Sequence, residues 1–87
     1  MSERGLLQFP LEFPIKVMGR HGTDLLPLTR LIVEKHAGPL SEDQIRDRPS
    51  AASNFLSITY VIQATSQDQL DAIYRELTAC EAVLMAL

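Results

Sequence analysis

The sequence predicts an α+β domain in which two helices cover one face of a four-stranded antiparallel sheet. The central observation is the segment 55–65, in which apolar and polar side chains alternate and neither Gly nor Pro occurs. A period of two is typical of a strand with one buried face and one wet face. Two segments with a helical spacing of apolar residues, 25–37 and 67–80, complete the pattern.

The bulk properties set the size and the class. A chain of 87 residues supports one hydrophobic core, so we expect a single domain at residues 9–87 after a flexible tail of residues 1–8. The net charge of −3 argues against a nucleic-acid-binding protein held by bulk charge, and no apolar run is long enough to span a membrane. Because Cys80 is the sole cysteine, no disulfide can form within the chain, and the expected location is the cytoplasm.

The first half of the chain predicts a strand and a helix. Two Phe-Pro pairs in residues 9–14 favour an extended entry into a strand at residues 15–18, which Gly19 is expected to end. Asp24 is the expected N-cap of the helix, and Gly38 begins the Gly-Pro pair that stops it. The apolar arc of this helix consists of Leu25, Leu28, Leu31, Ile32 and His36, and it is flanked by Leu26 and Val33.

The second half predicts a short edge strand, the central strand, a second helix and a last strand. Residues 45–48 are charged, as suits an exposed edge, and Ser66 with Gln69 matches a capping box at the start of the second helix. The buried arc of that helix is expected to consist of Leu70, Ile73, Tyr74, Leu77 and Cys80. In the last strand, residues 81–87, we expect Val83, Met85 and Leu87 to face the core and Ala82, Leu84 and Ala86 to face outward.

With right-handed crossovers, this element order predicts the ferredoxin-like βαββαβ arrangement, with strand order 4-1-3-2 and both helices on one face. Phe13 and Tyr60 are expected on the covered face. The other face then lacks the aromatic side chains that RNA-binding sheets stack on bases, so nucleic acid is not an expected partner. The side chains expected on this open face are Lys16, Met18, Arg46, Ser57, Thr59, Val61, Gln63 and Leu84.

Several short segments point to a known family. They are residues 13–19, 35–37, 49–50 with 54–55, and 64–65 leading to Tyr74 and Leu77. Together they resemble the bacterial YbeD family of small proteins of uncharacterised function, and the resemblance extends over residues 9–87. It implies a ferredoxin-like fold similar to the regulatory ACT domains that bind amino acids in metabolic enzymes. The function it implies is a non-catalytic module, without a cofactor, that binds a small ligand or a protein partner.

One end of the predicted sheet gathers polar side chains around the start of the first helix. Backbone N–H groups after Gly19 and Gly22, the helix dipole and two arginines there would suit a small anion. The alternatives are a cluster of solvated loop residues, or a small acyl-phosphate hydrolase that uses Arg20 and Asn54 although the motif of that class is missing. The residues expected at this end are Arg20, His21, Arg48, Ser50, Ser53 and Asn54.

The last strand and the open face favour association with protein. The last strand is an apolar, uncharged edge, and such edges are usually paired or protected. We therefore expect a homodimer or a protein partner to contact Leu84, Ala86, Met18 and Val61; the alternative is a monomer that tolerates a short exposed edge. No metal site is expected, because His21 and His36 flank the first helix and lie roughly 20 Å apart at a rise of ~1.5 Å per residue.

Overall fold

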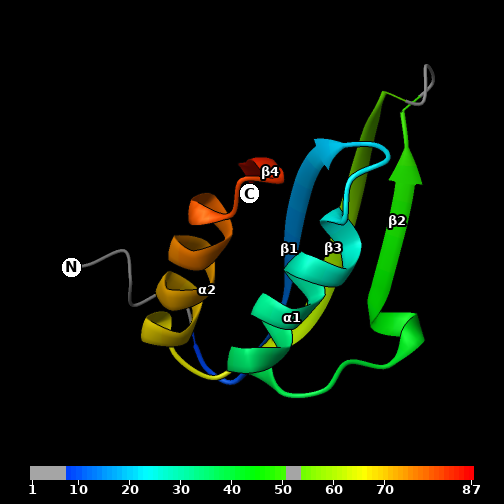
Figure 1. Cartoon of the computed structure of the whole chain (residues 1–87). Helices are drawn as coiled ribbons and strands as arrows, with labels where there is room; N and C mark the ends of the chain where they lie inside the picture. The colour runs from blue at the N-terminus through cyan, green and yellow to red at the C-terminus, as the bar shows by residue number, and fades with distance from the viewer. Residues whose placement is uncertain (1–7, 51–53) are drawn as a thin grey trace.

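The structure, a computed structural model, describes residues 8–50 and 54–87. Apart from Gln8, the tail expected at residues 1–8 lies outside the described residues, as does Ser53 of the expected anion site. The helices and strands follow in the order β1 (Leu11–Arg20), α1 (Leu25–Ala37), a 3-10 turn (Glu42–Gln44), β2 (Ile45–Pro49), β3 (Phe55–Ala64), α2 (Gln67–Ala79) and β4 (Val83–Ala86) (Figure 1).

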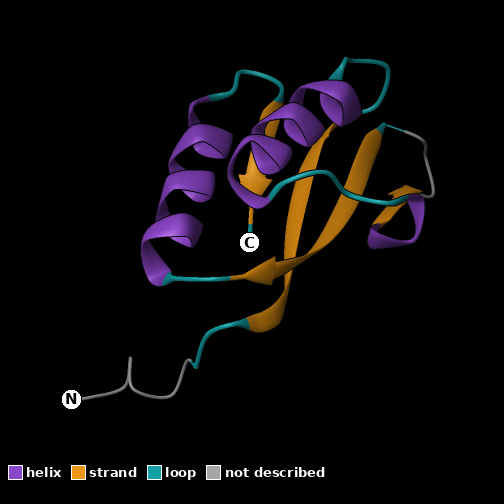
Figure 2. Ribbon diagram, turned by 90° about the horizontal axis from the view of Figure 1, so that it is seen from below, coloured by secondary structure: helices purple, strands orange, loops and turns teal. Residues whose placement is uncertain are grey.

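The four strands form one antiparallel sheet in the order β2-β3-β1-β4, which is the expected order 4-1-3-2 read from the opposite edge. Both helices lie on the same side of this sheet, as Figures 1 and 2 show. The predicted α+β architecture and strand order are therefore confirmed. No described helix or strand covers the other side of the sheet, which we call the open face.

The central strand β3 forms the middle of the core, as the alternation of its side chains predicts. Ile58, Tyr60 and Ile62 are each at most 1 % exposed. On the neighbouring strand β1, Ile15 pairs with Tyr60 and Val17 with Ile58, so both strands bury the same side. These side chains pack beneath Leu25 and Val33 of α1 and Leu70, Ile73 and Leu77 of α2.

Strand β1 is longer than expected, because it continues through both residues that were expected to limit it. The last hydrogen bonds between β1 and the residues at β4 join Lys16 to Leu87. Pro14 lies beyond them, so proline, which has no N–H, interrupts no hydrogen bond on that side of the strand. Gly19 does not end the strand. A Cβ there would collide with the carbonyl oxygen of Ala82, so glycine permits the close approach of the two chains.

Helix α1 has the predicted bounds but buries only part of the predicted arc. Its buried residues are Leu25, Thr29 and Val33, whereas Leu28 is 42 % exposed and Leu31 68 % exposed. Apolar side chains surround this helix, so spacing alone does not select one stripe. A hydrogen bond helps to fix the choice, because the Thr29 hydroxyl lies 2.6 Å from the Tyr60 hydroxyl beneath it and donates to the Leu25 carbonyl at 2.7 Å.

Helix α2 begins as predicted, since the Gln69 N–H donates to the Ser66 hydroxyl at 3.0 Å. Its buried residues Leu70, Ile73 and Leu77 belong to the predicted arc. Cys80, by contrast, is the C-cap residue and is only partly buried.

The orientation expected for Val83 and Leu84 agrees with the structure, but the orientation expected for residues 85–87 is wrong. Val83 pairs with Gly19 and Met85 with Met18, so the register shifts by one residue at Leu84. This bulge reverses the alternation. Ala86 therefore packs against the core together with Val83, whereas Met85 and Leu87 are 50 % and 66 % exposed.

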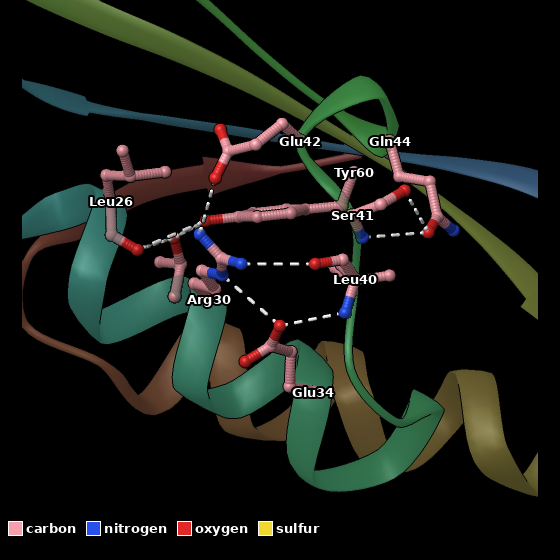
Figure 3. A network of polar contacts seen from close by, with 9 residues as sticks. Leu26, Arg30, Glu34, Leu40, Ser41, Glu42, Gln44 and Tyr60 are labelled. Atoms are coloured by element: carbon pink, nitrogen blue, oxygen red, sulfur yellow. Dashed lines mark hydrogen bonds and ion pairs between the residues drawn. The ribbon is translucent and has the colours of Figure 1, made fainter.

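A polar network closes the covered side between α1 and β2 (Figure 3). Arg30 donates from Nε to Glu34 at 3.2 Å and from Nη2 to the Leu40 carbonyl at 3.1 Å. Glu34 in turn accepts the Leu40 N–H at 2.8 Å. Ser41 and Gln44 form a capping box around the 3-10 turn, and Gln44 donates to the Val61 carbonyl at 2.9 Å.

Candidate functional site

The open face of the sheet is the candidate functional site, because its side chains are not used by the described core. Directly paired residues of antiparallel strands point to the same side. Next to the row of Pro14 and Val61, three further rows follow one another on this side. Arg46, Thr59 and Lys16 form one row, Arg48, Ser57 and Met18 form the next, and Arg20 with Phe55 forms the third.

Three of these side chains, Lys16, Arg46 and Arg48, form what we call the basic cluster. They border an open hollow of about 490 Å³. Ser57, Thr59, Val61 and Pro14 supply the rest of its lining, together with Asp47. Because Asp47 pairs with the buried Ile58, it belongs to the opposite side of β2. The hollow therefore has more cationic than anionic side chains at its border.

Beside the basic cluster lies an apolar strip, which we define as Met18, Phe55, Met85 and Leu87. Their exposed fractions range from 38 % for Phe55 to 66 % for Leu87. Met18, Met85 and Leu87 line one small hollow together with Lys16, and Met18 and Phe55 line a second one together with Arg48. Exposed apolar side chains grouped in this way mark a surface that can bind.

The polar end of the sheet contains only part of the expected anion site. The His21 N–H donates to the Asn54 carbonyl at 2.9 Å, which holds these two residues together. Arg20 pairs with Phe55 and Arg48 with Ser57, so both arginines belong to the open face. The N-terminus of α1 lies on the covered side. The structure thus places Arg20 and Arg48 on the open face and α1 on the covered side, and anion binding at this end stays a prediction.

The four residues expected at a protein interface lie in different environments. Met18 and Val61 are on the open face, and Leu84 is 53 % exposed at the bulge. Ala86 packs against the core instead. Contact with a partner through the other three residues stays a prediction.

Sequence reasoning missed Phe55, Met85 and Leu87 on the open face. For Phe55 the signal was present, since the alternation of β3 places it on the side of Ser57 and Thr59. For Met85 and Leu87 no signal was available, because the bulge depends on contact with β1. The statement that the open face lacks aromatic side chains is therefore wrong.

The ion pairs of the described residues lie on one side of the molecule. Among the described residues, the ion pairs join Arg30 to Glu34 and Glu42, and Lys35 and His36 to Glu76, all on the helical side. Hydrogen bonds with His36 and then Lys35 lower the pKa of Glu76. The Leu40 N–H and then the Arg30 guanidinium lower the pKa of Glu34. None of these ion pairs includes a residue of the basic cluster.

Two further classes of site are not seen in the described part of the chain. No three His, Cys, Asp or Glu side chains of residues 8–50 and 54–87 come together as metal ligands would. No helix in these same ranges has both the length and the apolar content needed to cross a bilayer.

Comparison with known proteins identifies relatives along the whole chain. A family described as "Protein of unknown function (DUF493)" matches residues 4–87. The UPF0250 protein of Leptothrix cholodnii is 41 % identical over 85 residues, which cover 98 % of this chain and 93 % of that protein. The UPF0250 protein NE1487 of Nitrosomonas europaea is 36 % identical over the full length of both chains.

A solved structure extends the likeness at the level of the fold. The solution structure of protein HP0495 from H. pylori aligns with a TM-score of 0.69 at 13 % identity, covering 93 % of this chain and 85 % of that one. The family matches confirm the resemblance read from the short segments. The chain belongs to the UPF0250 (DUF493) family of small bacterial proteins, the YbeD family of the sequence analysis.

Proposed function

We propose that the protein is a small non-catalytic regulatory module that acts by binding a protein partner through the open face of its sheet, in the manner of ACT-like domains. The observation that carries this proposal is the composition of the uncovered surface. Its exposed side chains include two methionines, Met18 and Met85, one phenylalanine, Phe55, and the arginines of β1 and β2. These residue types are enriched at protein–protein interfaces relative to the rest of a protein surface.

The apolar strip supplies the anchors in this proposal. Met is unbranched and adapts to the shape of a partner. Phe55 offers a flat apolar ring that neighbouring residues already cover in part, since it is 38 % exposed. The arginines beside the strip would form the charged rim. A partner that buries the strip gains hydrophobic free energy without first having to unfold any part of this chain.

The edge of β4 supports a second copy or a partner strand as one form of this contact. No charged or proline side chain lies in Val83–Ala86, whereas the opposite edge strand β2 carries Arg46, Asp47, Arg48 and Pro49. Charge and proline protect an edge against pairing with another chain. Of the two edges, β4 is therefore the one open to sheet extension, and we expect Leu84 to lie at such a contact.

Capture of partners from native cell extract, with identification by mass spectrometry, tests the proposal. Met18→Glu and Met85→Glu should each abolish capture of a protein that wild type retains, because a buried carboxylate in the contact is costly. The matched control is Leu31→Glu, which alters an apolar residue on α1 that is still more exposed than either methionine and should keep the capture. If all three variants retain the same protein, the open face is not the binding surface.

Sedimentation of the protein alone distinguishes a second copy from a different partner. A dimer that is lost in Leu84→Glu, with unchanged thermal unfolding, supports self-association through β4. A monomer at all concentrations assigns the open face to a different protein.

A small acyl-phosphate hydrolase is the second candidate function. The hydrogen bond between the His21 N–H and the Asn54 carbonyl favours it, because it holds Asn54 beside the end of β1, where Arg20 lies. Turnover of a generic acyl phosphate that vanishes in Arg20→Ala but persists in Arg75→Ala would establish this activity. Absence of turnover by wild type would eliminate it.

We also infer that the fold is the ferredoxin-like arrangement and that the protein acts in the cytoplasm. The βαββαβ order with strand order β2-β3-β1-β4 supports the first inference. The second is supported by the presence of a single cysteine, Cys80, which leaves the chain without a disulfide of its own.

A further inference from the structure

The basic cluster is built from three strands at fixed spacings. Arg46 and Lys16 both pair with Thr59, one from each side, so they stand in one row across β2, β3 and β1. Strands lie about 4.8 Å apart, which places the backbones of these two cations roughly 10 Å apart. Arg48 follows Arg46 by two residues on the same face, at about 7 Å along the strand.

Hydroxyl groups form the floor between these cations. Thr59 lies in the row between Arg46 and Lys16, and Ser57 pairs with Arg48 in the next row. Both hydroxyl residues line the hollow of about 490 Å³, a volume within the range of small-molecule sites, about 300–1,000 Å³. Cations at the rim and hydrogen-bond donors at the floor are what an anionic group needs.

Three cations, Lys16, Arg46 and Arg48, border the hollow against one carboxylate, Asp47, which belongs to the opposite side of β2. Among the described residues no ion pair includes Lys16, Arg46 or Arg48. On the same face of β1, the acidic residue is Glu12. It pairs with Gln63 and is separated from the row of Lys16 by the row of Pro14 and Val61. Like charges held close together repel one another, and an anion placed between them removes that repulsion.

We propose that the basic cluster binds a small molecule that carries at least two negatively charged groups, either phosphates or carboxylates. One anionic group can contact Arg46 and Lys16 across Thr59, and a second can contact Arg48 above Ser57. The cluster is bounded by Pro14 and Val61 on one side and by Met18 on the other, which limits the ligand to the size of the hollow. This binding goes beyond the proposed contact with a partner protein, because the cations hold the ligand by themselves, whereas in the partner contact they form only the rim around the apolar strip.

Titration of the isotope-labelled protein with pyrophosphate, followed by backbone amide shifts, tests the proposal. Saturable shifts should concentrate at Lys16, Arg46, Arg48 and Thr59. Arg46→Gln and Arg48→Gln should each weaken binding about tenfold, since each removes a hydrogen bond between charged groups. The matched control is Arg75→Gln, which removes an exposed arginine from α2 and should leave binding unchanged. Lys16→Gln serves as a replacement if either arginine variant fails to fold.

A parallel titration with citrate separates the two ligand classes. Tighter binding of pyrophosphate assigns the site to phosphates, and tighter binding of citrate assigns it to carboxylates; both results support the proposal. It is overturned if shifts are no larger than those caused by NaCl of equal ionic strength, or if Arg75→Gln weakens binding as much as Arg46→Gln.

A short oligothymidylate completes the test. If it binds more tightly than pyrophosphate and moves the signals of Arg20 and Phe55 as well, the ligand is single-stranded nucleic acid and the small-molecule assignment is wrong. The experiment uses the protein alone, so its failure leaves the partner-binding proposal intact, and loss of partner capture in Met18→Glu leaves this site intact.

Discussion

On the side covered by the helices, β1 and β3 contribute Val17, Ile58 and Tyr60, which are at most 1 % exposed. The adjacent positions of the same strands, Lys16 and Thr59, face the hollow on the open side. Neighbouring residues of one strand therefore serve different purposes. The covered side holds the fold together, and the open side is left free to bind.

Polar groups show the same division. On the covered side, the Thr29 and Tyr60 hydroxyls bond to each other, and Arg30 and Glu34 bond to each other and to Leu40 (Figure 3). Burial raises the pKa of the Tyr60 hydroxyl to about 12, so it stays protonated and able to donate at physiological pH. On the open side, the basic cluster has no described carboxylate in an ion pair. A satisfied network stabilises the fold, whereas an unsatisfied one is available to a ligand.

The largest effect is expected from one pair of substitutions in β3. Ile58→Ala should lower the free energy of unfolding by about 2–5 kcal/mol, because it leaves a cavity beneath the helices. Thr59→Ala, one residue further on the open face, should cost less than about 1 kcal/mol. Urea denaturation measures both. Equal losses would show that the open face contributes to the fold as much as the covered face does.

A smaller effect is expected from the buried hydroxyl pair. Tyr60→Phe should cost about 1 kcal/mol, since it removes the hydrogen bonds to Thr29 and to the Leu26 carbonyl. In a Thr29→Val background the same substitution should cost less, because the partner is already absent. A double-mutant cycle gives the coupling. Fully additive losses would mean that the bond between α1 and β3 contributes nothing.

The pH dependence of stability should come from the helical side. Glu34 and Glu76 have lowered pKa values in the folded state, so their contribution is fully present above the unfolded value of about 4.3. It is lost as the pH falls through their folded values. Urea unfolding between pH 7 and about pH 3 should show this decline, and Glu34→Gln should flatten it. A decline of the same steepness in Glu34→Gln and Glu76→Gln would contradict this origin.

The sequence predicts most of the covered side because its pattern is local. Strand β3 and helix α2 each show one unbroken apolar stripe, and the Ser66 cap is visible in the residue types alone. Ser41 and Gln44 carried the same capping signal at the 3-10 turn, where only a polar connection was expected. Local signals of this kind determine where elements begin and which side they bury.

The misassigned residues depend on contacts between distant segments. Leu28 and Leu31 are exposed because Thr29 faces Tyr60, which lies 31 residues further along the chain. Met85 is exposed because β4 bulges against β1. In both places the sequence pattern assigned to the core apolar side chains that are exposed in the structure. The open face was thus foreseen together with Lys16, Arg46 and Met18, but without Phe55, Met85 and Leu87, which complete the apolar strip.

The central claim is that the open face binds and does not hold the fold together. Urea unfolding of the triple variant Lys16→Gln, Arg46→Gln and Arg48→Gln tests it most directly. The free energy of unfolding should stay within about 0.5 kcal/mol of wild type or rise, since the substitutions are exposed and remove like-charge repulsion, while pyrophosphate binding disappears. A loss of more than about 1 kcal/mol would contradict the claim, because it would make the three cations part of what stabilises the fold.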